Sequence, residues 1–197
     1  MTEAIESRLR ELVIETPSWG YADSGTRFAT FPQDGRPRDV FERVDDAAEV
    51  HRLTGTAPKV ALHFPWDTVD DYDELRAEIE SRGLQVGAVN PNLFQDPDYK
   101  LGSVTHPDAA VREKAVAHML ECVEIATGLG ATAQSLWLAD GTNYPGQDDL
   151  RERRRRMLDC LGRVYAELPA EQEFLVEYKF FEPVHYEPST SKESLHA

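Results

Sequence analysis

Short apolar runs alternate with helical patterns along the whole chain, and this alternation limits the possible folds more than any other feature. Runs with the length and composition of β-strands occur at residues 12–19, 59–66, 84–90, 132–140 and 173–181. Segments with apolar residues spaced for one face of a helix lie between them, at residues 39–53, 70–82, 105–127 and 148–168. This β-α-β-α-β-α-β-α-β order predicts an α/β fold with a parallel sheet.

The connections between these elements differ in length. Those from helix to strand are short, whereas three of those from strand to helix are long and polar. Enzymes with parallel sheets carry function on the loops that follow the carboxyl ends of the strands. No Gly-rich phosphate-binding sequence follows the first run, which counts against a dinucleotide-binding fold. The pattern therefore predicts a partial (β/α)₈ TIM barrel of about five βα units, since a full barrel takes about 250 residues. Residues 1–185 form the incomplete barrel domain and residues 186–197 a polar tail in this prediction.

Composition limits the classes of partner. The net charge is −15, with 36 acidic and 21 basic residues, which argues against nucleic acid or an anionic membrane surface. The sequence has no apolar run long enough for a transmembrane helix, and its N-terminus lacks the pattern of a signal peptide. Cys122 and Cys160 lie in helical patterns, so we expect them to be reduced core residues. A cytoplasmic location is the resulting expectation.

The predicted fifth strand carries two charges where a buried parallel strand should be apolar. Val176, Tyr178 and Phe180 share one face, and Glu177 and Lys179 share the other. Because a buried unpaired charge is costly, these two side chains need partners. Two interpretations stay open. In one they form a structural ion pair, and in the other Glu177 binds a metal while Lys179 holds an oxygen of a substrate.

A histidine and several aromatic residues are expected at the ends of the other strands. His63 alternates with apolar neighbours on the second strand and points inward, and Trp66 follows it. Phe94 lies beyond the third strand, and Trp137 points inward from the fourth. Aromatic walls with a few polar groups suit a small polyhydroxylated ligand, and His63 could move a proton near neutral pH. The alternative is a core histidine bonded to the backbone, with Phe94 and Trp137 as packing residues.

The chain resembles the broad-specificity L-rhamnose isomerases through five segments: ETPSWGYADSGTRF, VALHFPWD, YKLGSVTHPDAAVREKAV, LWLADGTNYPGQDD and LVEYKFFEP. These isomerases belong to the xylose-isomerase-like, metal-dependent (β/α)₈ barrels, and the resemblance covers nearly all of residues 11–185. It implies an aldose–ketose isomerase that interconverts L-rhamnose and L-rhamnulose and often accepts other sugars, such as D-allose and D-psicose.

The resemblance also implies roles for individual residues. Glu177 would be a ligand of the structural divalent metal, typically Mn²⁺. Lys179 would contact the sugar oxygens nearest the reacting carbons. His63 would bond the ring or distal oxygens and assist ring opening.

Aromatic residues receive binding roles from the same resemblance. Trp66, Phe94 and Trp137 would line the sugar pocket. Phe28 would reach the site of a neighbouring subunit, which implies a homo-oligomer, a tetramer in the family.

The family takes its remaining metal ligands and its catalytic base from the last three strands of the barrel. We therefore expect the remaining ligands beyond the C-terminus, and we expect this length, as an N-terminal fragment, to be inactive alone. The competing hypotheses are a non-catalytic carbohydrate-binding or assembly fragment and a metal-dependent phosphodiesterase of the same barrel type.

Overall fold

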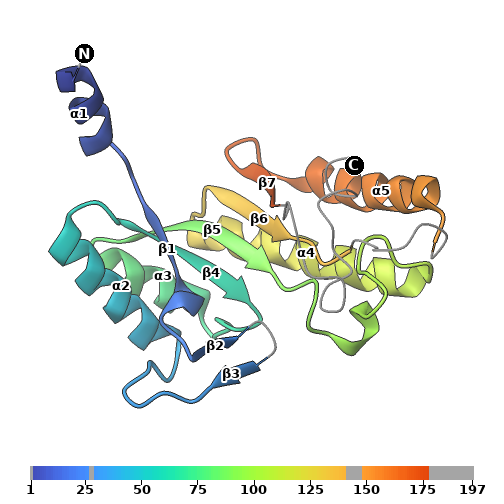
Figure 1. Cartoon of the computed structure of the whole chain (residues 1–197), viewed down its shortest axis with the longest axis horizontal. Coiled ribbons are helices and arrows are strands. Elements are labelled where there is room, and N and C mark those ends of the chain that lie inside the picture. The colour runs from blue at the N-terminus through green and yellow to red at the C-terminus, as the bar shows by residue number, and fades with distance from the viewer. Residues whose placement is uncertain (1, 27–28, 141–147, 178–197) are drawn as a thin grey trace. The chain divides into compact units, whose positions relative to one another are not determined.

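The structure is a computed structural model that describes residues 2–26, 29–140 and 148–177 (Figure 1). The chain divides into two compact units. The first comprises Met1–Val89 and Ala126–Thr132, and the second comprises Asn90–Ile125 and Ala133–Ala197. Each unit is described by itself below. The predicted boundary at residue 185 lies outside the described residues.

The first unit is built around parallel strands. Its elements are α1 (Thr2–Arg10), β1 (Glu15–Pro17), the 3₁₀ helix η1 (Ser18–Gly20), β2 (Ser24–Thr26), β3 (Ala29–Phe31), α2 (Val40–Thr54), β4 (Lys59–Phe64), α3 (Tyr72–Ser81) and β5 (Gln85–Pro91). Strand β1 pairs with β4 in parallel, with Thr16 opposite Val60, and β5 lies on the other side of β4. Helix α1 stands away from the other helices and the strands of this unit in Figure 1.

Helix α2 confirms the helix that the spacing of apolar residues predicts at residues 39–53. The Asp39 side chain accepts a hydrogen bond from the Glu42 amide at 3.0 Å and caps the amino end. Gly55 ends the helix with a φ of +70°, a left-handed conformation that glycine adopts without strain. Val44 and Ala47 are fully buried, so one face of α2 belongs to the core of this unit.

The segment between β1 and α2 differs from the prediction. A strand over residues 12–19 was expected, but β1 covers Glu15–Pro17 and continues as η1. The following segment, expected to be a loop, contains the antiparallel pair β2–β3. Three-residue strands are too short to leave an alternation of apolar and polar residues in the sequence, which explains why the pattern did not indicate them.

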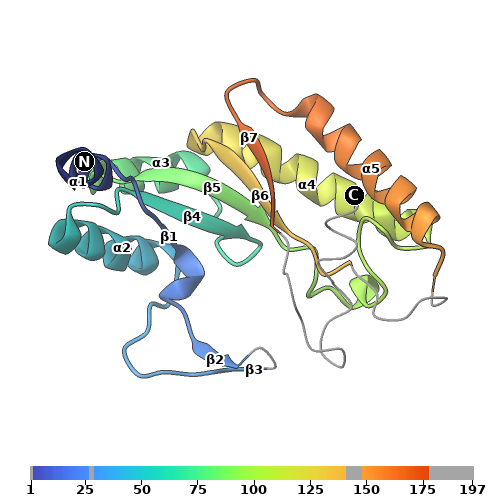
Figure 2. The same cartoon turned by 45° about the horizontal axis from the view of Figure 1, so that its top comes forward.

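The second unit has its own core of buried side chains, and Figure 2 shows the helices and strands that surround it. Its elements are η2 (Pro97–Tyr99), α4 (Ala109–Leu129, whose last turn belongs to the first unit), β6 (Ala133–Trp137), α5 (Leu150–Glu167) and β7 (Glu173–Glu177). Strands β6 and β7 pair in parallel, with Trp137 opposite Glu177. The cluster of buried core residues comprises Leu93, Tyr99, Val104, Ala115, Val116, Met119, Val123, Leu136, Leu138, Met157, Cys160 and Val164.

Helix α4 begins later than predicted. The predicted helix began at Thr105, a residue type that often caps helices, but α4 starts at Ala109, where the Asp108 carboxylate accepts a hydrogen bond from the Ala110 amide at 2.9 Å. Thr105 instead bonds to Asp140, whose buried carboxylate needs donors more than the helix end does. The tertiary contact therefore overrides the local capping signal.

Strand β7 is only partly covered. Phe174 packs against the core of the second unit, as its face was expected to do. Val176, on the same face, is 42% exposed, so the prediction that this face is buried is wrong at Val176. The strand was expected to reach residue 181, and the part beyond Glu177 lies outside the described residues.

The predicted fold class is confirmed. Strands β1, β4, β5, β6 and β7 alternate with helices, as a partial xylose isomerase-like TIM barrel of about five strands requires. Cys122 and Cys160 are buried free thiols, as predicted. Within the described ranges, no helix combines the length and the hydrophobicity that a membrane span needs.

Candidate functional site

The first candidate site lies at the carboxyl end of β4. His63 is the next-to-last residue of this strand and only 6% exposed. Its ring stacks on the indole of Trp66, with centroids 3.7 Å apart and planes 16° apart. Trp19 approaches the same imidazole edge-on, at 5.3 Å. The structure thus brings the rings of His63, Trp66 and Trp19 together, and Trp19 was not among the predicted site residues.

A buried carboxylate lies beneath this stack. Asp67 is fully buried, and its Oδ2 accepts hydrogen bonds from the amide of His63 at 2.7 Å and from Ser18 Oγ at 2.5 Å. Its Oδ1 accepts from a guanidinium nitrogen of Arg43 at 2.5 Å. Asp67 therefore joins the end of β4 to η1 and to α2 within the first unit.

The second candidate site lies in the second unit, at the ends of β5 and β6. The rings of Phe94 and Trp137 meet edge-to-face, with centroids 4.8 Å apart and planes 88° apart. Asn92 shapes the turn before Phe94, because its Oδ1 accepts hydrogen bonds from the amides of Phe94 and Gln95 at 3.2 and 3.0 Å. The structure therefore brings Phe94 and Trp137 together, as the prediction of a shared aromatic wall requires.

A second buried carboxylate follows β6. Asp140 is 1% exposed, and its Oδ2 accepts from the amides of Ser103 and Thr105, each at 2.8 Å, and from Thr105 Oγ1 at 2.9 Å. Its Oδ1 accepts from Ser103 Oγ at 2.6 Å. Gly102 has a φ of +103°, and a Cβ there would lie 3.0 Å from Asp140 Oδ2, so this close approach requires glycine.

Tyr99 is the last residue of η2 and precedes Ser103 and Thr105, which Asp140 binds. Its side chain belongs to the core of the second unit. Burial, together with nearby acidic groups and against the opposing effect of Lys114, raises the pKa of Tyr99 to about 12. Its phenol is therefore a neutral packing group at physiological pH.

The remaining predicted site residues are only partly described. Glu177 is exposed and is the last residue of β7. Lys179 and Phe28 lie outside the described residues. Among the described residues, no three His, Cys, Asp or Glu side chains gather closely enough to hold a metal ion. A catalytic divalent cation usually needs several such ligands, so the described residues alone do not fit a metal centre.

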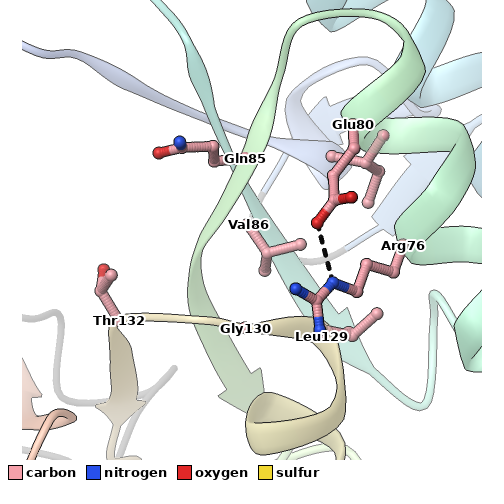
Figure 3. A pocket seen from close by; sticks show the side chains of 8 residues that line it. Arg76, Glu80, Gln85, Val86, Leu129, Gly130 and Thr132 are labelled. Carbon is pink, nitrogen blue, oxygen red and sulfur yellow. Dashed lines mark hydrogen bonds and ion pairs between the residues drawn. The ribbon is translucent and has the colours of Figure 1, made fainter.

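A cavity of about 220 Å³ lies elsewhere in the first unit, near the start of β5 (Figure 3). Arg76 borders it, donating to Glu80 at 2.8 Å and to the carbonyl of Gly128 at 3.2 Å. Its guanidinium therefore satisfies a carbonyl in the last turn of α4 and interacts favourably with the negative end of that helix dipole. These contacts give Arg76 a structural role, and the cavity contains none of the predicted sugar-binding residues.

Comparison with known families decides the classification. The model of the xylose isomerase-like TIM barrel family matches residues 30–183, which is more than half of the chain. The chain belongs to this family. A probable sugar isomerase of Rhizobium meliloti (strain 1021) is 41% identical over 189 residues, covering 93% of this chain and 44% of the relative. One of Mesorhizobium japonicum is 41% identical with the same coverage. The chain thus spans less than half the length of these relatives.

Solved structures of this architecture support the fold. An L-ribulose 3-epimerase matches with a TM-score of 0.61 at 18% identity, covering 94% of this chain and 55% of that one. A D-allulose 3-epimerase from Methylomonas sp., solved in complex with D-allulose, matches with a TM-score of 0.62 at 13% identity, covering 94% and 57%. At these identities the likeness concerns the fold alone.

Neither of the two buried carboxylates was among the predicted site residues. Asp67 lies three residues after the end of β4, and Asp140 lies three residues after the end of β6. This constant distance appears only with the observed strand ends, because the predicted strands covered residues 59–66 and 132–140. The partners of Asp67 could not be read from the sequence either, because Ser18 and Arg43 are 49 and 24 residues away from it.

Proposed function

We propose that the protein is a metal-dependent aldose–ketose isomerase that interconverts L-rhamnose and L-rhamnulose. The observation that carries this proposal is the 41% identity to probable sugar isomerases over 189 residues. The five segments that resemble the L-rhamnose isomerases support the choice of sugar. Two strand ends that carry aromatic residues, a histidine and buried carboxylates support a polar, ring-shaped ligand.

The stack at the end of β4 is the proposed sugar face of the first unit. The indole of Trp66 can cover the apolar C–H groups of a sugar while a nitrogen of His63 bonds to a ring or distal oxygen. An imidazole there can also carry the proton that moves when the sugar ring opens. Phe94 and Trp137 form the corresponding aromatic surface of the second unit.

The proposed cofactor is Mn²⁺, with Glu177 as one ligand. The other ligands would come from residues outside the described ranges or from another chain, because the described residues do not provide them. Lys179 would contact the sugar oxygens beside the reacting carbons, and Phe28 would complete the site of a neighbouring subunit in a homo-oligomer. Two buried free thiols support a reducing, cytoplasmic location.

Calorimetric titration of the purified protein with L-rhamnose tests the proposal. With Mn²⁺ present we expect saturable binding that weakens in the Trp66→Ala and Glu177→Gln variants. Addition of a chelator should weaken binding to the same extent as Glu177→Gln. Asp46→Asn, on the exposed face of α2, is the matched control and should bind like the wild type.

The same titration separates the competing functions. Binding that is unchanged by the chelator and by Glu177→Gln would contradict the isomerase assignment. It would support a non-catalytic carbohydrate-binding protein. No binding of L-rhamnose, L-rhamnulose, D-allose or D-psicose with Mn²⁺ present would remove the sugar assignment altogether. Formation of ketose from L-rhamnose in the same mixture would establish turnover directly.

A further inference from the structure

The segment from His63 to Asp67 forms a turn whose first and last residues are hydrogen-bonded to each other. The amide of His63 donates to the Asp67 carboxylate at 2.7 Å, and the amide of Asp67 donates back to the carbonyl of His63 at 2.8 Å. The turn therefore has hydrogen bonds at both of its ends. Trp66 lies within this turn, so the conformation of the turn decides where its indole stands relative to the imidazole.

Asp67 also fixes the turn to two other elements of the first unit. Ser18 Oγ in η1 donates to Oδ2 at 2.5 Å, and Arg43 in α2 donates to Oδ1 at 2.5 Å. The same guanidinium nitrogen of Arg43 lies 3.4 Å from the carbonyl oxygen of Trp66. One carboxylate thus ties the stacked pair to η1 and α2.

We propose that Asp67 is the positioning residue of the sugar face: it holds His63 and Trp66 in their stacked arrangement before any ligand arrives. This inference rests on the proposed function for its ligand, a sugar, and on the hydrogen bonds for its geometry. Asp67 itself is fully buried, so it acts through the two rings. Fixing a binding surface in advance reduces the entropy that the ligand must remove on binding.

An ionised carboxylate suits this position because every group around it donates. The His63 amide, Ser18 Oγ and the Arg43 guanidinium all offer hydrogens to the two oxygens. An asparagine would present its NH₂ group either to the guanidinium or to the amide and hydroxyl. Neither orientation satisfies all three donors, so Asp67→Asn keeps the volume of the side chain while it releases the turn.

The stack gives a signal that does not depend on any substrate. An imidazole 3.7 Å above an indole face has ring protons shifted upfield by the ring current, which proton NMR detects. The chain has six histidines, and the His63 signal is assigned as the one that His63→Gln removes. We expect Asp67→Asn to lose most of this upfield shift, whereas the matched control Asp46→Asn should retain all of it.

Two milder variants keep the test valid if Asp67→Asn does not fold. Ser18→Ala and Arg43→Gln each remove one anchor, and each should lose part of the His63 shift. In a calorimetric titration, L-rhamnose affinity should fall on the order of tenfold in Asp67→Asn, because misplaced binding groups lose their alignment with the ligand. The affinity should fall less in the two single-anchor variants.

The outcomes separate the positioning role from the proposed function. A full upfield shift in a folded Asp67→Asn protein, or in both single-anchor variants, would overturn the positioning role. Loss of the shift in Asp67→Asn, in a protein that binds no sugar even as wild type, would support the positioning role and contradict only the proposed ligand.

Discussion

Both units bury a carboxylate, but the groups that surround the two carboxylates differ. Each buries a carboxylate three residues beyond the end of a parallel strand. Each carboxylate accepts from a serine hydroxyl, and Asp67 accepts from one backbone amide whereas Asp140 accepts from two. Asp67 also has a cation, Arg43, at 2.5 Å. Within the described residues, Asp140 accepts only from the neutral groups of Ser103 and Thr105 and forms no ion pair.

This difference determines which substitutions should destabilise each site. A buried charge pair is sensitive to the loss of either partner, because the remaining charge stays in a medium of low polarity. A carboxylate surrounded by neutral donors depends instead on the number and the orientation of its hydrogen bonds. The first unit should therefore respond to a change of charge, and the second to a change of geometry.

Asp67→Asn is expected to have the largest effect on stability. It leaves the guanidinium of Arg43, whose side chain is 15% exposed, without its counter-ion, which costs about 3–5 kcal/mol of unfolding free energy. Urea-induced unfolding followed by circular dichroism measures this loss. The double variant Asp67→Asn, Arg43→Gln removes both charges and should regain part of it. A double variant as unstable as the sum of the two single ones would show that the pair is not coupled.

Loss of a serine hydroxyl should lower the unfolding free energy more in the second unit than in the first. Within the described part of the chain, Ser103 Oγ is the one donor to Asp140 Oδ1, so Ser103→Ala should cost about 2 kcal/mol. Ser18→Ala should cost about 1 kcal/mol, because Asp67 Oδ2 keeps the His63 amide and Oδ1 keeps Arg43. The same urea titration compares the two serine variants. Equal losses of unfolding free energy would contradict the proposed difference between the surroundings of Asp67 and Asp140.

Asp140→Asn should be milder than Asp67→Asn. The amide oxygen can take the place of Oδ2 and accept from Ser103 and Thr105, while the NH₂ group donates to Ser103 Oγ, which can accept. The cost is then about 1 kcal/mol, for the loss of charge assistance. A loss equal to that of Asp67→Asn would mean that charge dominates in both units.

Alkaline pH should also lower stability, and it should act on the second unit. Burial raises the pKa of the Cys160 thiol to about 11 from an ordinary value of 9.0, and it raises the pKa of Tyr99 to about 12. Because the folded pKa of each group is raised, its contribution to stability is fully present below its unfolded pKa and is lost as pH rises through its folded pKa. The urea midpoint should therefore fall between pH 9 and 11. Cys160→Ala should flatten this decline, and an unchanged slope would contradict the assignment.

The parts of the fold that could be predicted are those that short stretches of sequence determine. The helix at residues 39–53 was predicted from the spacing of its apolar residues, and in the structure Asp39 and Gly55 cap its two ends. His63 and Trp66 were predicted as site residues because a buried strand ends there and alternation fixes the direction of His63. The pair β2–β3 could not be predicted in this way, since strands of three residues contain too little periodicity.

The buried carboxylate clusters depend on the tertiary fold instead. Thr105 has the sequence of a helix cap, and it is only the approach of Asp140, 35 residues later, that gives its side chain another partner. The number of donors around each acid is likewise set by elements far apart in the chain. Residue type and spacing indicated where a site would lie, and packing decided which side chains hold it.

A titration of the protein with L-rhamnose, followed through the ring signals of His63 in proton NMR, shows whether the sugar binds at the His63–Trp66 stack. We expect a saturable change in the His63 signals, with the same midpoint as calorimetric binding, since the sugar should lie against this stack. His63 signals that stay unchanged while L-rhamnose saturates the protein would contradict binding at this stack.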